Sequence, residues 1–327
     1  MALLRLEPFP NFSKTLEKNK WADFVELLCL ESPDKEYSLN DIITLYSQEE
    51  LSGISNGDED HSEKVDKLRA QFAEIFFYIF SRMDYINDYY PFKKIDEDTI
   101  KLDVLDEKKM LYMFLLFSSN TSYITDNTIP PYFTKAFERI SIDIMKMIYP
   151  NFINEIFGTS VKKGEFFYGG SLIDKLLKLA QCFNTSLQEK AKVNPRFLFP
   201  SGDAGIDLIS YFKPDMEKCN TYMIPLCVGQ CSCSYEKWNE KQYLIMKRSL
   251  DNLFIDLSDY NEYMFLPFPL RGINGKWASE EAVKIQTIII DRIRFLNIIH
   301  KNGKATILDN EVTNYMKVML RNFDVEC

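Results

Sequence analysis

The residue types best suited to chemistry lie in one stretch of this chain, residues 194–241. Two apolar runs of β type lie inside it, at residues 205–209 and 223–234, and a turn-rich segment joins them. This pattern predicts a hairpin. The first run carries the carboxylate of Asp207 and the second carries the amide of Gln230. Carboxylate and carbonyl oxygens on neighbouring strands are the ligands that Mg²⁺ prefers, so we expect a divalent-cation site here.

Side-chain alternation sorts the residues of the two predicted strands. Gln230 and Ser232 project from the same face of the second strand, and Cys231 projects from the other. Asp207 lies in the middle of the first strand. If the hairpin brings the two faces together, Asp207 and Gln230 converge, which is what a shared ion requires.

Residues 202–207 (GDAGID) and 230–232 (QCS) resemble a known signature. It is the G-D-x-G-x-D … Q-x-K motif of the Mrr-like branch of the PD-(D/E)XK restriction-endonuclease-like superfamily. The resemblance implies a nuclease fold, Mg²⁺ (or Mn²⁺) as cofactor and DNA as substrate. It also implies a setting in restriction or anti-phage defence.

The same resemblance implies roles for particular residues. It assigns the metal to three positions: Asp207, Gln230 and the main-chain oxygen of Cys231. The family's lysine, which assists the attacking water, is replaced by Ser232. Within this superfamily the lysine can move to the next helix, where Lys237 and Lys241 follow. We therefore take both as catalytic candidates beside Asp207 and Gln230, with ordinary surface lysines as the alternative.

An acidic residue from the helix before the first strand often joins the site in this superfamily. We place that helix at residues 172–183, with Glu165 and Asp174 as the nearby acids. Solvated charges on the helix face are the alternative. Asp203, in the turn before Asp207, is expected to brace that turn through backbone amides.

The cysteines raise a zinc hypothesis. Four of the seven lie close together, at Cys219, Cys227, Cys231 and Cys233. They form no C-x₂-C pair, so packing as small buried residues is the favoured interpretation. The chain has only two histidines, which argues against zinc enzymes and His-dependent hydrolases.

Composition sets the class of protein. The chain has 327 residues, 46% of them apolar, and no run of 18 uncharged apolar residues, so we expect no membrane span. We expect no signal peptide in the first residues, and the cysteine usage fits a reducing cytoplasm. Residues 1–160 carry a net charge of −11 and residues 161–327 carry +2. Only the second part is therefore expected to tolerate DNA phosphates.

Hydrophobic periodicity predicts an α+β protein. The first part, 1–157, is expected to be a mostly helical module, with helices at 12–30, 38–46, 61–86, 106–118 and 131–149. The second part, 158–327, is expected to be a restriction-endonuclease-like α/β domain with a central mixed sheet flanked by helices. Its strands are predicted at 196–199, 206–212, 222–234 and 262–267, the last confined to an edge or ended by Pro267 and Pro269. Its helices are predicted at 172–183, 235–254, 279–300 and 310–322.

Two functional hypotheses follow. The first is a cytoplasmic, Mg²⁺-dependent DNA endonuclease whose acidic helical part contacts a protein partner or a second copy of the chain. The second is a catalytically inactive subunit with a nuclease fold, which binds DNA or a partner protein in a defence complex. A small-molecule enzyme would instead show an apolar pocket far from Asp207.

Overall fold

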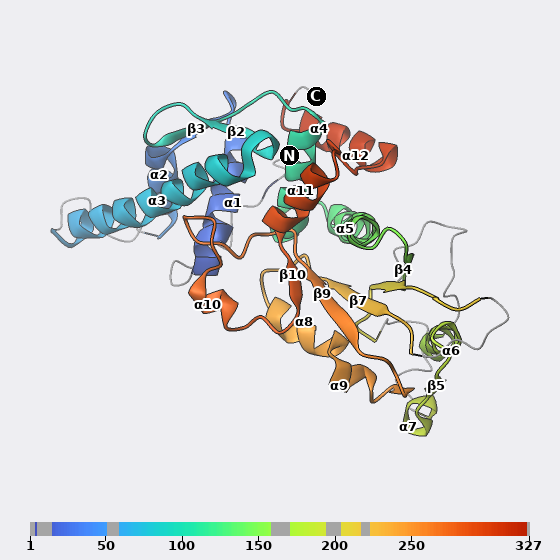
Figure 1. Cartoon of the computed structure of the whole chain (residues 1–327). Coiled ribbons are helices and arrows are strands. Elements are labelled where there is room, and N and C mark those ends of the chain that lie inside the picture. The colour runs from blue at the N-terminus through green and yellow to red at the C-terminus, as the bar shows by residue number, and fades with distance from the viewer. Residues whose placement is uncertain are drawn as a thin grey trace. The chain divides into compact units, whose positions relative to one another are not determined.

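The computed structural model describes residue 4 and residues 15–50, 59–157, 171–193, 204–216 and 223–325. It confirms a mixed α+β protein (Figure 1). The chain forms two compact units, each assembled from separate stretches of sequence. The first contains Met1–Asn127, Phe268–Val283 and Leu308–Cys327, and the second contains Thr128–Pro267 and Lys284–Ile307. These units differ from the predicted division after residue 157, because the helix and strand before that point belong with the large sheet.

The first unit is mainly helical. Its longer helices are α1 (Thr15–Glu31), α2 (Leu39–Glu50), α3 (Glu59–Ile86), α4 (Glu107–Ser119) and α12 (Asn310–Arg321). Helix α4 begins at the N-cap Asp106, whose side chain accepts a hydrogen bond from the Lys109 amide, and it is buried from Met110 to Ser119. A helix that is apolar all round belongs in the centre of a core. The predicted helices of this part are therefore confirmed, with ends shifted by a few residues.

A small antiparallel sheet also belongs to the first unit, and the periodicity analysis missed it. Its order is β1 (Glu36–Ser38), β3 (Thr99–Leu102), β2 (Phe92–Lys94). Strands of three and four residues are too short to show an alternating pattern. The short helices η1 (Asn87–Tyr89), η2 (Thr121–Tyr123) and α10 (Ser279–Ala282) complete the unit.

The core of the first unit contains a buried charged cluster. Arg82 Nη1 donates to Asp23 Oδ1 at 2.7 Å and to Glu26 Oε1 at 2.5 Å. The Tyr90 and Tyr112 hydroxyls donate to the two oxygens of Glu26, at 2.8 and 2.9 Å. The three charged side chains are fully buried. Buried charges need such partners, so this cluster links α1 firmly to α3 and α4.

A five-stranded mixed sheet forms the centre of the second unit. Its order is β10 (Ile288–Ile290), β9 (Tyr260–Phe265), β7 (Leu226–Cys231), β6 (Leu208–Tyr211), β4 (Ile153–Ile156). The pairs β4–β6 and β6–β7 are antiparallel, whereas β7–β9 and β9–β10 are parallel. The predicted hairpin is therefore confirmed as β6 and β7. The strand predicted at 196–199 lies outside the described residues.

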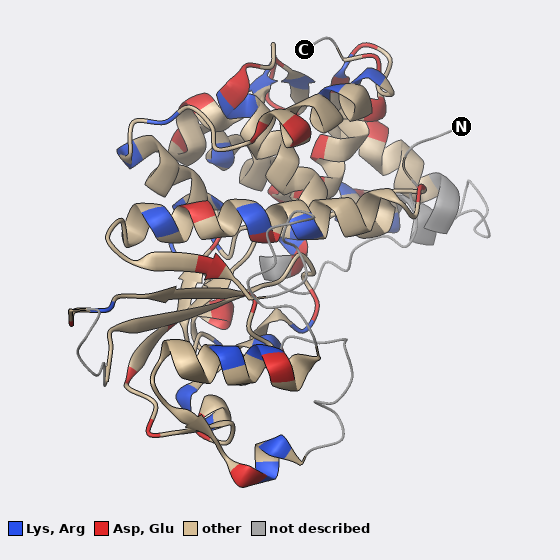
Figure 2. Ribbon diagram, turned by 90° about the vertical axis from the view of Figure 1, so that its right-hand side faces the viewer, with Lys and Arg blue, Asp and Glu red and all other residues tan. Residues whose placement is uncertain are grey.

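Helices cover both faces of this sheet (Figures 1 and 2). Helix α5 (Ile129–Ile148) lies on one face, beside α11 (Arg292–Lys301). The other face carries α6 (Leu172–Cys182), α8 (Trp238–Ile245) and α9 (Lys247–Leu250), whose apolar side chains share a core with β6 and β7. The short elements β5 (Ser186–Leu187), α7 (Glu189–Lys192) and β8 (Phe254–Ile255) complete the unit.

Two predictions about the last third of the chain are wrong. The helix expected over 279–300 is instead α10, strand β10 and α11. Its three consecutive isoleucines pair with β9, because β-branched residues suit a strand and the apolar spacing alone allows both structures. The helix expected over 235–254 breaks at Met246, which is extended, and its last residue belongs to β8.

Pro267 and Pro269 were expected either to confine β9 to an edge or to end it, and the structure shows the second outcome. This strand is internal, because β7 pairs with one side and β10 with the other. Pro267 follows the end of the strand and does not lie within it, which agrees with the alternative that proline ends the strand. The central parallel strands now point their carboxyl ends in one direction, and the residues predicted to be functional lie at that end.

Candidate functional site

Asp207 and Gln230 lie at the same end of neighbouring strands. Leu208 opposite Gly229 is the last pair of the β6–β7 ladder, and each candidate is the next residue outward on its strand. The backbone of Asp207 is fixed on both sides: its N–H donates to the Gly229 carbonyl at 3.0 Å, and its carbonyl accepts from the Phe157 N–H at 2.8 Å. Strand register therefore brings the two residues to the same end of the sheet.

The side chain of Asp207 makes a further hydrogen bond to the end of β7, just beyond the last main-chain pair of the β6–β7 ladder. Its Oδ2 accepts a hydrogen bond of 2.7 Å from the main-chain N–H of Cys231. Asp207 is 6% exposed, so this bond forms out of bulk water. A carboxylate that accepts from a backbone amide makes a charge-assisted bond, which is stronger than a neutral one. Asp207 thus has a structural role at the strand end in addition to any role in binding.

Gly205 positions the loop that leads to Asp207. Its φ is +80°, which favours glycine, and a Cβ at this position would lie 2.4 Å from the Cβ of Leu244 on α8. Ala204, the residue before it, also has a positive φ of 55°. The close approach of backbone and helix leaves no room for a larger residue. The glycine of the predicted motif is therefore explained by packing.

Gln230 and Ser232 are buried, as their predicted common face implies. Gln230 is 7% exposed and Ser232 is 1% exposed. The same face of β7 carries Leu226 and Val228 in the apolar core, so alternation is confirmed for this strand. Oε1 of Gln230 is buried and has no hydrogen-bond partner among the described residues. Such an orphaned acceptor is uncommon in folded proteins and invites a donor or a cation.

The two candidate lysines lie in different surroundings. Lys237 is exposed and precedes α8 with a left-handed φ of 57°. Lys241 is half-buried one turn into α8, and its positive charge lowers the pKa of the Cys233 thiol. Cys233 lies just beyond the end of β7, so Lys241 is close to the strand end that carries Gln230. Of the two, Lys241 is the one whose charge acts on a residue just beyond that strand end.

Glu138 on α5 is an acidic residue near the same strand end, and the sequence analysis missed it. Burial, then the charge of Asp207, then that of Glu138 hold the pKa of the Cys231 thiol well above its usual value. Burial and the charge of Glu138 raise the pKa of Cys233 to about 12. Glu138 therefore acts electrostatically on two thiols that lie on the face of β7 towards α5, opposite the face that carries Gln230.

The helix that directly precedes the first strand of the large sheet is α5, not α6 as predicted. Asp174 has a local role, since it forms a capping box with Ser171 at the start of α6. Glu165 lies outside the described residues, as do Asp203 and Cys219. Glu138 was missed because α5 was assigned to the helical module. Its position on the helix just before β4 was the signal that would have found it.

The donor set suits a hard cation better than a soft one. No group of three His, Cys, Asp or Glu side chains in the described part of the chain has a metal-binding arrangement. Mg²⁺ does not require such a cage, because it is commonly held by one or two carboxylates together with waters and substrate phosphates. The Asp207 carboxylate and the unpaired Gln230 amide oxygen are donors of that type. Carboxylate and amide oxygens are donor types that Mg²⁺ and Mn²⁺ accept.

Two further observations concern the cysteines and the helices. The five cysteines that the structure describes, Cys29, Cys182, Cys227, Cys231 and Cys233, are all free thiols. Within the described ranges, no helix combines the length and the apolar character needed to cross a membrane.

Comparisons of the chain with protein-family models, with curated proteins and with solved structures gave no match.

Proposed function

We propose that the chain is a divalent-cation-dependent DNA endonuclease of the PD-(D/E)XK type, acting in the cytoplasm in restriction or anti-phage defence. The observation that carries the proposal is the pairing of Asp207 and Gln230 at one strand end, with the Gln230 Oε1 buried and unpaired among the described residues. A carboxylate and an amide oxygen that lacks a donor, carried on neighbouring strand ends, are a suitable beginning of a Mg²⁺ site.

Each residue of the site receives one role in this proposal. Asp207 and Gln230, with the main-chain oxygen of Cys231, hold the cation. Mg²⁺, when bound, supplies a Lewis acid and a water that is easier to deprotonate. Lys241 offsets the negative charge that develops on the scissile phosphate.

Charge distribution supports a nucleic-acid substrate for the second unit. That unit carries 21 Lys and Arg against 17 Asp and Glu, whereas the first unit carries 18 against 31. Lys and Arg positions, blue in Figure 2, occur along both α5 and α6, on opposite faces of the sheet. A net charge of +4 permits contact with phosphates, and a net charge of −13 opposes it.

A second function is favoured by the bond between Asp207 and Cys231. Because this bond uses Asp207 to complete the ladder, the residue would be retained for folding even without turnover. Ser232, in the motif position of the lysine, is 1% exposed and supplies no cation. In this alternative the chain is an inactive nuclease-fold subunit that binds DNA or a partner protein.

Cleavage assays separate the two functions. The full-length protein is incubated with supercoiled, linear and single-stranded DNA in Mg²⁺ or Mn²⁺, and its cation binding is measured by calorimetry. Asp207→Asn is compared with Asp215→Asn, an exposed acid that follows the other end of β6. The endonuclease proposal expects cleavage and cation binding that only Asp207→Asn removes. DNA binding without cleavage in either metal would favour the inactive subunit.

A further inference from the structure

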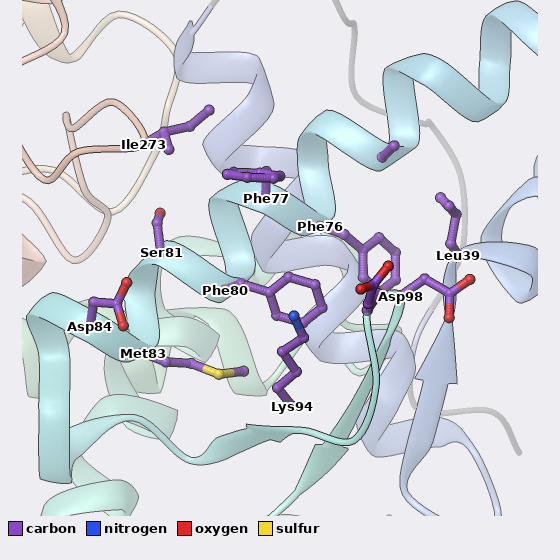
Figure 3. A pocket seen from close by; sticks show the side chains of 12 residues that line it. Leu39, Phe76, Phe77, Phe80, Ser81, Met83, Asp84, Lys94, Asp98 and Ile273 are labelled. Atoms are coloured by element: carbon purple, nitrogen blue, oxygen red, sulfur yellow. The ribbon is translucent and has the colours of Figure 1, made fainter.

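A groove of about 690 Å³ lies on the first compact unit, along one side of α3 (Figure 3). Its apolar lining comes from one stretch of that helix: Phe76, Phe77, Phe80 and Met83. Leu39 of α2 and Ile273 of the segment Phe268–Val283 also line it. A cavity of this volume, lined mainly by aromatic and aliphatic groups, is typical of a binding site.

Phe77 marks the groove as more than a packing defect. Helix α3 buries an apolar stripe at helical spacing: Phe72, Ile75, Phe76 and Ile79. Phe77 lies outside that stripe and is 63% exposed. Among the described residues this ring is not part of the buried core, and Figure 3 shows it at the groove. An exposed aromatic side chain within an apolar groove is a typical anchor for a protein partner.

The charges at the groove are mainly negative. Asp84, Glu97 and Asp98 contribute carboxylates to the lining, and Lys94 is the basic side chain among the lining residues. The whole unit carries 18 Lys and Arg against 31 Asp and Glu. This field repels nucleic acid and anionic lipid surfaces and attracts basic partners.

One contact within the groove shows how a cation is accommodated there. The ammonium nitrogen of Lys94 lies 4.6 Å from the centre of the Phe80 ring (Figure 3). This is a cation–π contact, favoured by the negative face of the aromatic ring. Lys94 itself is exposed and comes from the edge strand β2, so it is able to move aside. A lysine or arginine of a partner would find the same aromatic face and the neighbouring carboxylates.

We propose that this groove binds a short segment of a partner protein that carries an aromatic or aliphatic anchor flanked by Lys or Arg. The anchor packs on Phe77 and Met83, and the basic side chains face Asp84 and Glu97. Lys94 occupies the cation position over Phe80 until the partner binds. This inference stands on the first unit alone and does not depend on the proposed nuclease activity.

The experiment begins with a displayed library of random peptides selected on the full-length protein. The expected consensus joins an apolar anchor to basic residues, and a synthetic peptide of that consensus is then measured by fluorescence anisotropy. Phe77→Ser is expected to weaken binding by about tenfold or more, as loss of an interface anchor does. Val104→Ser, which changes an exposed apolar residue elsewhere in the unit, is the matched control.

Charge gives the second test. The double variant Asp84→Asn, Glu97→Gln is expected to weaken the peptide and to reduce the dependence of its affinity on salt. Lys94→Ala is expected to strengthen binding, because it removes the resident cation. An acidic consensus, or peptides bound equally well by wild type and Phe77→Ser, would overturn the proposal. So would a selection that enriches no peptide.

Discussion

The carboxylate of Asp207 lies 2.7 Å from the main-chain nitrogen of Cys231, at the point where the β6–β7 ladder ends. A single side chain thereby replaces a main-chain acceptor. The same side chain is the first metal ligand in the proposed function. Structural and chemical roles of Asp207 must therefore be separated by substitutions that affect them differently.

Asp207→Ala and Asp207→Asn provide that separation. Alanine leaves the Cys231 N–H without its acceptor, which costs about 1–3 kcal/mol for a buried group. Asparagine keeps an acceptor oxygen of similar shape but lacks the negative charge. We expect Asp207→Ala to lower the free energy of unfolding in urea clearly more than Asp207→Asn, while both abolish cation binding. Equal destabilisation by the two variants would show that the charge, rather than the acceptor, supports the strand end.

Arg82 is expected to be among the most sensitive positions in the first unit. Arg82→Met removes the cation that Asp23 and Glu26 share and leaves two carboxylates fully buried. Breaking a buried pair in this way costs about 3–5 kcal/mol. Lys108→Met, which removes a partner of Asp88 at the surface, is the control and should change stability much less. Denaturant unfolding of both variants checks this, and similar midpoints for the two would contradict it.

Gly205 and Gly303 form a matched pair for separating steric contact from backbone strain. Both have positive φ, at +80° and +67°. A Cβ at Gly205 would collide with Leu244, whereas a Cβ at Gly303 would meet nothing within 4 Å. Gly303→Ala should therefore cost about 1–2 kcal/mol from the left-handed backbone alone. Gly205→Ala should cost more, and thermal unfolding that ranks the two in the opposite order would contradict the packing argument.

Much of the fold is readable from the sequence, and the exceptions have physical causes. Long amphipathic helices such as α3, α5 and α12 are specified by their own periodicity. Strand β10 is not, because Ile288–Ile290 has apolar spacing compatible with a helix and becomes a strand by pairing with β9. Strands β1, β2 and β3 are short, so only their partners define them.

The residues of the candidate site are likewise only partly predictable from local sequence signals. Asp207 and Gln230 are close in sequence to turn and strand signals, so local reasoning brought them together. Glu138 lies on α5, about seventy residues before Asp207 on a helix that was assigned to the other part of the chain. The difference between Lys237 and Lys241 was likewise invisible, because it depends on which turn of α8 lies near the end of β7. Long-range packing leaves no local sequence pattern, and it determines both the position of Glu138 and the difference between the two lysines.

The thiol of Cys233 gives a prediction about pH. Burial and the charge of Glu138 raise its pKa from 9.0 to about 12, so the folded state favours the protonated thiol. This contribution to stability is fully present below pH 9 and is lost as the pH rises towards about 12, since the unfolded chain then ionises first. We expect Cys233 to be alkylated by iodoacetamide far more slowly in the native protein at pH 8.5 than in urea, as mass spectrometry of the labelled peptides would reveal. Equal rates in the two states would show an accessible, ionised thiol.

Lys241 and Lys237 test which cation serves the proposed cleavage. Both lie within the same few residues, but only Lys241 acts on Cys233 at the end of β7. Lys241→Met should lower the rate of DNA cleavage by about 10²–10³-fold, the usual effect of removing one group that stabilises transition-state charge. Lys237→Met, the matched exposed control, should leave the rate nearly unchanged. The measurement is single-turnover cleavage of a labelled duplex in Mn²⁺. If Lys237→Met is the slow variant, the lysine must approach the site from before α8, and the assignment of Lys241 fails while that of Asp207 stands.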